Sequence, residues 1–197
     1  MPHELLQPGS VILFGEIHGA QELPALFGEA VCNTVASGHT VEVGFEVPQE
    51  EQASFDSFFA SSGAPSDVDA LLGTPFWQSD YQDGRRSRAI AGLLERLRQL
   101  RASGFPVSVF TFDIAAGEET SEREKRMADY VAAHVRTHPA AITMTLVGEV
   151  HAWNGIQASV QWVGILRKPV FMSDRSGARR PLVRSGYAPV GHRAIVG

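Results

Sequence analysis

Two copies of one short phrase, far apart in the chain, limit the folds open to this sequence. Residues 10–19 read Ser-Val-Ile-Leu-Phe-Gly-Glu-Ile-His-Gly, and residues 145–153 read Thr-Leu-Val-Gly-Glu-Val-His-Ala-Trp. In each copy a short apolar run, typical of a buried strand, leads into Gly-Glu-x-His. Because residues two apart in extended backbone point to the same side, each phrase predicts a carboxylate and an imidazole side by side at a strand end. The two pairs are Glu16 with His18 and Glu149 with His151.

The rest of the chain alternates between strand patterns and helix patterns, which predicts an α/β fold: a mostly parallel sheet with helices on both faces. Strand patterns cover 10–15, 40–47, 106–113, 142–148 and 169–172, with 194–196 as a further edge strand. Helical patterns cover 21–37, 49–60, 68–72, 85–102, 121–138 and, less regularly, 154–165. Ser121 and Glu124 fit a capping box at the start of the helix that ends near His138.

The length of 197 residues predicts one α/β domain, 1–197. Its least regular segment, 49–83, is interpreted as an insertion or a lid, and we expect the aromatic residues there to pack rather than line a pocket. Cys32 is the only cysteine, which excludes an intrachain disulfide and a cysteine zinc site.

Charge and hydropathy exclude several classes of partner. The net charge of −5 and the pI of about 5.8 give no basic field for nucleic acid. No apolar run approaches the roughly 20 residues of a membrane-spanning helix, and no signal peptide is recognisable, so we expect a cytoplasmic protein without a membrane partner. The oligomeric state stays open, a homodimer included.

Ionisable residues at the strand ends predict the functional site. In parallel α/β sheets, ligands bind outside the carboxyl ends of the strands. That rule gathers six residues onto one edge: Glu16, His18, Glu46, Asp113, Glu149 and His151. Glu42 and Glu46 lie on the same face of their strand, but only Glu46 is near its carboxyl end. We interpret His39, His134 and His138 as structural or solvated histidines.

Two mechanisms fit such a cluster. In one, Glu16, His18, Glu46, Glu149 and His151 supply ligands to a divalent zinc, manganese, iron or cobalt ion that activates water. In the other, a histidine oriented by a glutamate acts as general base, and another histidine or an arginine stabilises negative charge. The sequence has no Gly-x-Ser-x-Gly elbow, P-loop or dinucleotide-binding glycine pattern, so serine-hydrolase, kinase and NAD functions have no support.

Several motifs, in order along the chain, resemble those of the erythromycin esterase-like, ChaN-like and TIKI-like superfamily. They are 15–19 (Gly-Glu-Ile-His-Gly), 44–46 (Gly-Phe-Glu), the aromatic and basic stretch from Phe76 to Arg88, 123–128 (Arg-Glu-Lys-Arg-Met-Ala) and 148–152 (Gly-Glu-Val-His-Ala). Glu124 stands where the family motif has Asp, and Glu149 adds a carboxylate to the closing motif.

The resemblance implies a site and a range of activities. By position, Glu16, His18, Glu46 and His151 would be the core of the site, and Arg123 would stabilise an anion or position the substrate. Members cleave macrolide lactones with Glu and His, resemble metal-dependent proteases, or bind haem. We therefore expect a hydrolase that acts on an ester, lactone or amide of a small molecule. The alternatives are a haem- or metal-binding protein without turnover and a partner-binding module.

Overall fold

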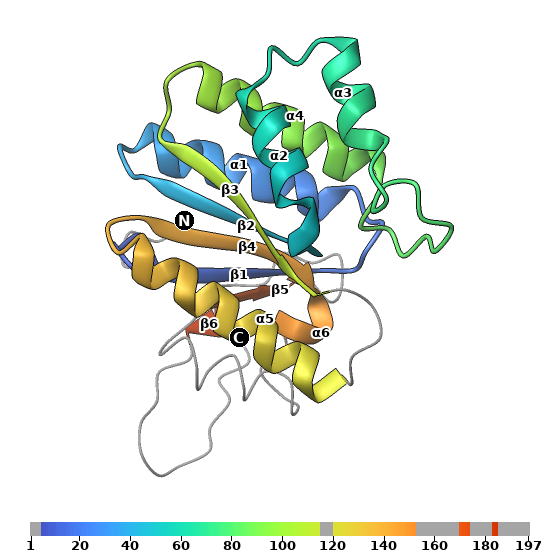
Figure 1. Cartoon of the computed structure of the whole chain (residues 1–197). Helices are drawn as coiled ribbons and strands as arrows, with labels where there is room; N and C mark the ends of the chain where they lie inside the picture. Colours follow the sequence, from blue (N-terminus) through green and yellow to red (C-terminus); the bar gives the residue numbers. More distant parts are fainter. Residues whose placement is uncertain (1–4, 115–119, 153–169, 174–182, 185–197) are drawn as a thin grey trace.

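The computed structural model describes residues 5–114, 120–152, 170–173 and 183–184, which form an α/β fold around one sheet (Figure 1). The sheet order is β3-β2-β4-β1-β5-β6, and every neighbouring pair is parallel except β5 and β6. The strands are β1 Val11–Glu16, β2 Val41–Pro48, β3 Val107–Asp113, β4 Ile142–Gly148, β5 Val170–Ser173 and β6 Val183–Arg184. The predicted fold class is confirmed.

Helices cover both faces of the sheet (Figure 1). One face carries α1 (Glu22–Ala36), the 3₁₀ turn η2 (Gln49–Glu51), α2 (Gln52–Ala60), α3 (Pro65–Leu72) and α4 (Arg88–Ala102); the other carries α5 (Thr120–Thr137) and α6 (Glu149–Ala152). The first helical layer and the sheet share one hydrophobic core, in which Phe14, Phe27 and Leu94 are fully buried. A smaller core lies under α5, around Phe112 and Met127.

The alternation of side chains along β2 decides which of its residues face α5. Val41, Val43, Phe45 and Val47 belong to the larger core. The side chains between them must point to the opposite face, because successive residues of a strand alternate. Glu42 and Glu46 therefore face the α5 side, one at each end of β2.

Helix and strand boundaries differ from the predictions by a few residues. The helix predicted from residue 85 begins at Arg88, because the hydroxyl of Ser87 accepts a hydrogen bond from the Ile90 amide (3.3 Å) as its N-cap. The helix predicted at 49–60 is the 3₁₀ turn followed by α2, and the one at 68–72 is α3. The predicted elements at 154–165 and 194–196 lie outside the described residues.

The segment 49–83 contributes most of its aromatic side chains to the larger core. Five of them are buried there: Phe55, Phe58, Phe59, Phe76 and Trp77. The prediction of packing is confirmed for these five residues but not for the exposed Tyr81, while the single domain and the insertion or lid stay predictions. Within the described residues, no helix has the length and apolar character that crossing a membrane requires.

Candidate functional site

Glu46, at the carboxyl end of β2, is the centre of the site. Because β2 and β4 are parallel neighbours with Phe45 opposite Leu146, Glu46 lies beside the end of β4. The Gly148 amide donates a hydrogen bond to Glu46 Oε2 (2.7 Å), and the side chain of Glu46 is 5% exposed. A buried carboxylate needs such partners, because burial without them strongly disfavours the charge.

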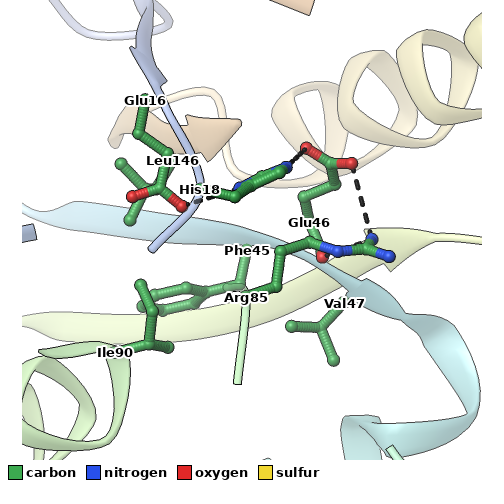
Figure 2. A pocket seen from close by; sticks show the side chains of 8 residues that line it. All are labelled: Glu16, His18, Phe45, Glu46, Val47, Arg85, Ile90 and Leu146. Atoms are coloured by element: carbon green, nitrogen blue, oxygen red, sulfur yellow. Dashed lines mark hydrogen bonds and ion pairs between the residues drawn. The ribbon is translucent and has the colours of Figure 1, made fainter. Parts of the chain in front are cut away.

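His18 lies between two carboxylates (Figure 2). Its Nδ1 is 3.0 Å from Glu16 Oε1, and its Nε2 is 3.6 Å from Glu46 Oε2. In the first contact the carboxylate can only accept a hydrogen bond, so Nδ1 carries the proton and the lone pair is on Nε2. The second contact is too long for a hydrogen bond, which leaves Nε2 available. The His18 side chain is 23% exposed.

His151 reaches Glu46 from the other side. It follows β4 on the short helix α6, and its Nε2 is 3.4 Å from Glu46 Oε1. Its Nδ1 is 2.6 Å from Glu124 Oε1 of α5. Burial of the ring opposes its charge, but the hydrogen bonds and charges of Glu124 and Glu46 outweigh burial and raise the pKa of His151 to about 9. His151 is therefore an imidazolium at neutral pH.

Gly148 gives the two histidines their space. A Cβ on this residue would lie 2.9 Å from His18 Nε2 and 3.4 Å from His151 Cδ2. The first distance is shorter than atoms in proteins tolerate, so a larger residue would push His18 away. The glycine of the repeated Gly-Glu-x-His phrase thus has a steric role in the second copy.

Two arginines and Asp113 surround Glu46 on its remaining side. Arg123, from α5, donates to Glu46 Oε1 (2.9 Å) and, through Nε and a terminal nitrogen, to both oxygens of Asp113 (2.9 and 2.8 Å). Arg85 donates to Asp113 Oδ2 (2.6 Å). Figure 2 shows its other contact, with Glu46 Oε1 at 3.4 Å. Asp113 also accepts from the Ile114 amide (2.8 Å). The role of Asp113 is therefore to hold two guanidinium groups over the site.

A close backbone contact brings Arg85 to the sheet edge. Gly84, with φ +91°, packs on the backbone of His18 and Gly19, and a Cβ on Gly84 would lie 2.3 Å from the Gly19 amide nitrogen. Only glycine permits that approach with that φ. Asp83, the residue before Gly84, forms an ion pair with Arg85 (2.7 Å) and fixes the Arg85 side chain.

The charges shift several pKa values in opposite directions. Burial disfavours ionisation of Glu46, but contacts with His151, His18 and Arg85 hold its pKa below the ordinary value. Burial raises the pKa of Glu16, against the lowering effect of His18. Burial opposes the charge of Arg123, yet Asp113 and Glu46 raise its pKa. The site is a balanced network of buried charges.

A small cleft opens on this network (Figure 2). Its lining includes Glu16, His18, Glu46 and Arg85 on the polar side, with Phe45 and Leu146 among the apolar residues. The volume of the cleft that the centre of a water molecule can occupy is about 10 Å³, which is roughly what one water molecule needs. A water could therefore reach His18, whereas a larger substrate would have to bind at the mouth or move a side chain.

The structure brings together most of the predicted residues: Glu16, His18, Glu46, Asp113, Arg123 and His151. Among the described contacts, none joins Glu149 to them, and its buried Oε2 has no hydrogen-bond partner. The catalytic and metal-binding roles predicted for these residues and Glu149 stay predictions.

Two residues of the network, Arg85 and Glu124, were not among the predicted site residues. Arg85 falls in the aromatic and basic stretch of the resemblance, and the Asp83-Gly84 pair before it was the available signal of a tight turn. The predicted capping box is wrong, because α5 begins at Thr120 and the Glu124 carboxylate contacts His151.

A second Glu/His cluster lies at the opposite end of β2. Glu42, His134 and His138 each offer one ligand atom within 4.8 Å of the others, so these three residues could hold a metal ion. The sequence alone gives both histidines a structural or solvated role.

Comparisons with known proteins agree on the fold. ChaN of Campylobacter jejuni, a structure described as showing cofacial haem binding, has a TM-score of 0.60 and 14% identity, over 93% of this chain and 90% of that one. A structure described as a bacterial protein toxin has a TM-score of 0.53 and 17% identity, over 77% of this chain and 31% of the toxin chain. Neither the protein-family models nor the curated proteins give a match. ChaN belongs to one of the groups that the motifs resemble, and at these identities the likeness concerns the fold alone.

Proposed function

We propose that the chain is a hydrolase that cleaves an ester, lactone or amide bond of a small molecule with the Glu/His network at the carboxyl edge of its sheet. The observation that carries the proposal is the placement of His18, with Glu16 on Nδ1 (3.0 Å) and Nε2 unengaged in a cleft that admits one water. A carboxylate, an imidazole and a water in this order make a general-base arrangement.

In the proposed reaction, His18 Nε2 removes a proton from the water as the water oxygen attacks the carbonyl carbon. Glu16 keeps the His18 ring in the required tautomer and stabilises the imidazolium that forms, as an orienting carboxylate does in other hydrolases. The C–O or C–N bond then breaks, and the leaving group takes the proton back from Nε2 of the His18 imidazolium, which restores the neutral base. General bases of this kind contribute about 10²- to 10⁴-fold to the rate.

The cationic side of the network suits the negative charge that develops on the carbonyl oxygen. Arg85 and Arg123 are held in place by Asp113, so they need no reorganisation during the reaction. His151, charged at neutral pH, faces Glu124 and Glu46 with its two ring nitrogens and is not among the residues that line the cleft, so its role is to position Glu46. His18 thus acts first as base and then as acid.

The contacts of Glu46 favour the mechanism without a metal at this site. Its oxygens are engaged by the Gly148 amide and by Arg123, and Arg85 and both histidines lie within 3.6 Å. A divalent cation bound to Glu46 would have to displace these donors beside two guanidinium groups, against their charge.

The test is hydrolysis of a panel of small esters, lactones and amides. We expect His18→Ala to lower kcat/KM about 10²- to 10⁴-fold on any substrate that the wild-type protein turns over. His39→Ala, a substitution of a histidine outside the network, is the matched control and should leave the rate unchanged. Undiminished activity in both His18→Ala and His151→Ala would overturn the proposal.

Haem binding without turnover is the second candidate, and the fold that the chain shares with ChaN is what favours it. Two features weigh against it. Five of the six aromatic residues of segment 49–83 are buried in the core, with Tyr81 the exposed exception, and the cleft has room for about one water. A haem titration followed by absorbance separates the candidates: a Soret shift at one haem per chain, lost in His18→Ala, would favour haem binding.

A further inference from the structure

The end of the sheet away from the proposed hydrolytic site carries a second constellation of ligand-bearing side chains. Glu42, near the start of β2, is 5% exposed and faces α5. His134 is in the last turn of α5, and His138 follows the helix one residue after its end. Residues four apart on a helix lie on the same side, which places both imidazoles near Glu42.

We propose that Glu42, His134 and His138 form a binding site for a divalent transition-metal ion, with zinc or cobalt as the best fit. One carboxylate oxygen and two imidazole nitrogens are the donors that these ions take, whereas magnesium and calcium require oxygen ligands. Three protein ligands would leave one position of a tetrahedral zinc site for water.

The distances fit a site that needs only a small adjustment. His134 Nε2 and Glu42 Oε2 are 3.0 Å apart, and ligands at about 2.0–2.1 Å from a tetrahedral ion lie roughly 3.3 Å from each other. The ligand atoms of all three residues lie within 4.8 Å. His138 is exposed, so a small shift of its ring, with the Nδ1 hydrogen bond kept, can shorten the remaining distances.

Hydrogen bonds around His138 leave a nitrogen for the metal. Its Nδ1 is 3.0 Å from the carbonyl oxygen of His134 and 3.0 Å from the Thr137 hydroxyl, which itself donates to that carbonyl (2.8 Å). The carbonyl can only accept, so Nδ1 carries the proton and Nε2 has the lone pair. Metal-binding histidines commonly show this pattern, a backbone carbonyl on one nitrogen and the ion on the other.

Aromatic stacking orients His134. Its ring stacks on Phe110 (centroids 3.8 Å apart, 14° between planes) and on His138 (4.2 Å, 22°). A ring held on both faces loses little freedom when it binds an ion, which favours affinity. The simpler interpretation is a buried Glu42–His134 ion pair covered by His138. The two interpretations differ on one point: only a metal site needs His138 as a ligand.

The experiment is a titration of the EDTA-treated protein, without an affinity tag of histidines, with Co²⁺, followed by the visible absorption of the ion and by calorimetry. We expect one Co²⁺ per chain. His138→Ala should weaken binding by more than about 100-fold, since loss of a ligand's hydrogen-bond partner alone costs 10- to 100-fold. Because His138 is exposed, this substitution should leave the fold intact. Glu42→Gln should weaken Co²⁺ binding by a similar factor.

The control variants are His39→Ala, a nearby histidine outside the cluster, and His18→Ala at the other end of the sheet, and both should bind Co²⁺ like the wild type. No binding by the wild-type protein would overturn the proposal, as would equal affinity in His138→Ala. Binding that is lost in His18→Ala but kept in His138→Ala would assign the ion to the carboxyl edge and would also overturn it. None of these outcomes depends on hydrolytic activity.

Discussion

The two ends of β2 use the same residue types in opposite electrostatic surroundings. Glu42 and Glu46 are four residues apart on one strand, both buried, and both face the α5 side of the sheet. Helix α5 serves both ends: Arg123 and Glu124 lie in the site around Glu46, and His134 lies against Glu42. Glu46 is surrounded by two guanidinium groups, an imidazolium and a backbone amide. The hydrogen bond described for Glu42 is to a single imidazole.

The difference lies in what compensates the buried carboxylate. At Glu46 the arginines and His151 already compensate the charge of the carboxylate. The carboxylate in turn shifts the pKa values of its neighbours, as in sites of acid–base chemistry. At Glu42 the partners are imidazole nitrogens. An imidazole can be neutral and can then bind a metal cation. A glutamate–histidine pair therefore indicates proton chemistry or metal binding according to the permanent charges beside it.

The largest expected difference between the two ends is in stability. Glu46→Gln would remove the carboxylate that Arg85, Arg123 and His151 share, and losing one partner of a buried charge network costs about 3–5 kcal/mol. Glu42→Gln keeps a hydrogen-bond partner for His134, so we expect a loss of about 1 kcal/mol. Urea unfolding of both variants measures the two values, and equal losses would remove the contrast.

The pH dependence of stability sharpens the comparison further. The folded-state pKa of His151, about 9, exceeds the ordinary value of 6.5, so folding favours its protonated form. The resulting stabilisation, about 3 kcal/mol, is complete below pH 6.5 and is lost as the pH rises to about 9. His151→Gln should abolish this decline, whereas His134→Gln at the other end should keep it. Unfolding free energies at pH 6, 7.5 and 9 decide, and a decline that persists in His151→Gln would contradict the assignment.

A smaller effect on stability, with a larger one on activity, is expected at Gly148. In Gly148→Ala the added Cβ forces His18 Nε2 out of position. The flexible imidazole can give way, so we expect less than about 1 kcal/mol of lost stability but at least tenfold lower kcat/KM, because general-base catalysis depends on placement. Gly92→Ala, where a Cβ meets no neighbour, is the control. Unchanged kinetics in Gly148→Ala would show that His18 does not need its observed position.

The smallest effect concerns His138, the exposed member of the cluster that it forms with Glu42 and His134. Without metal, His138→Ala should change the free energy of unfolding by no more than about 0.5 kcal/mol, as surface substitutions usually do. With saturating Zn²⁺ the wild-type protein should gain about 2.7 kcal/mol at 100 times Kd, and the variant should gain much less. Thermal unfolding with and without Zn²⁺ measures both. An equal gain in the variant would place the ion elsewhere.

Much of the fold and of the carboxyl-edge site could be predicted, because both follow from local patterns. Apolar runs predicted the strands β1 to β5, and the rule for parallel sheets brought Glu16, His18, Glu46 and His151 to one edge. These residues sit at strand ends, so the strand order did not have to be known.

Contacts between distant segments could not be predicted in the same way. Arg85 reaches the site through the packing of Gly84 on Gly19, a loop-to-loop contact without a periodic pattern. Glu124 had a plausible local role as a capping residue, and its true partner, His151, comes from another element. The pairing of His134 with Glu42 joins residues 92 positions apart, so neither position alone indicated a site.

The most direct test of the central claim is the rate of hydrolysis before and after metal removal, on any panel substrate that the protein turns over. If the carboxyl edge works by proton transfer with His18 as base, the EDTA-treated, metal-free protein retains its kcat/KM, and His18→Ala loses it. A rate that disappears on metal removal and returns with Zn²⁺ or Co²⁺ would contradict the account.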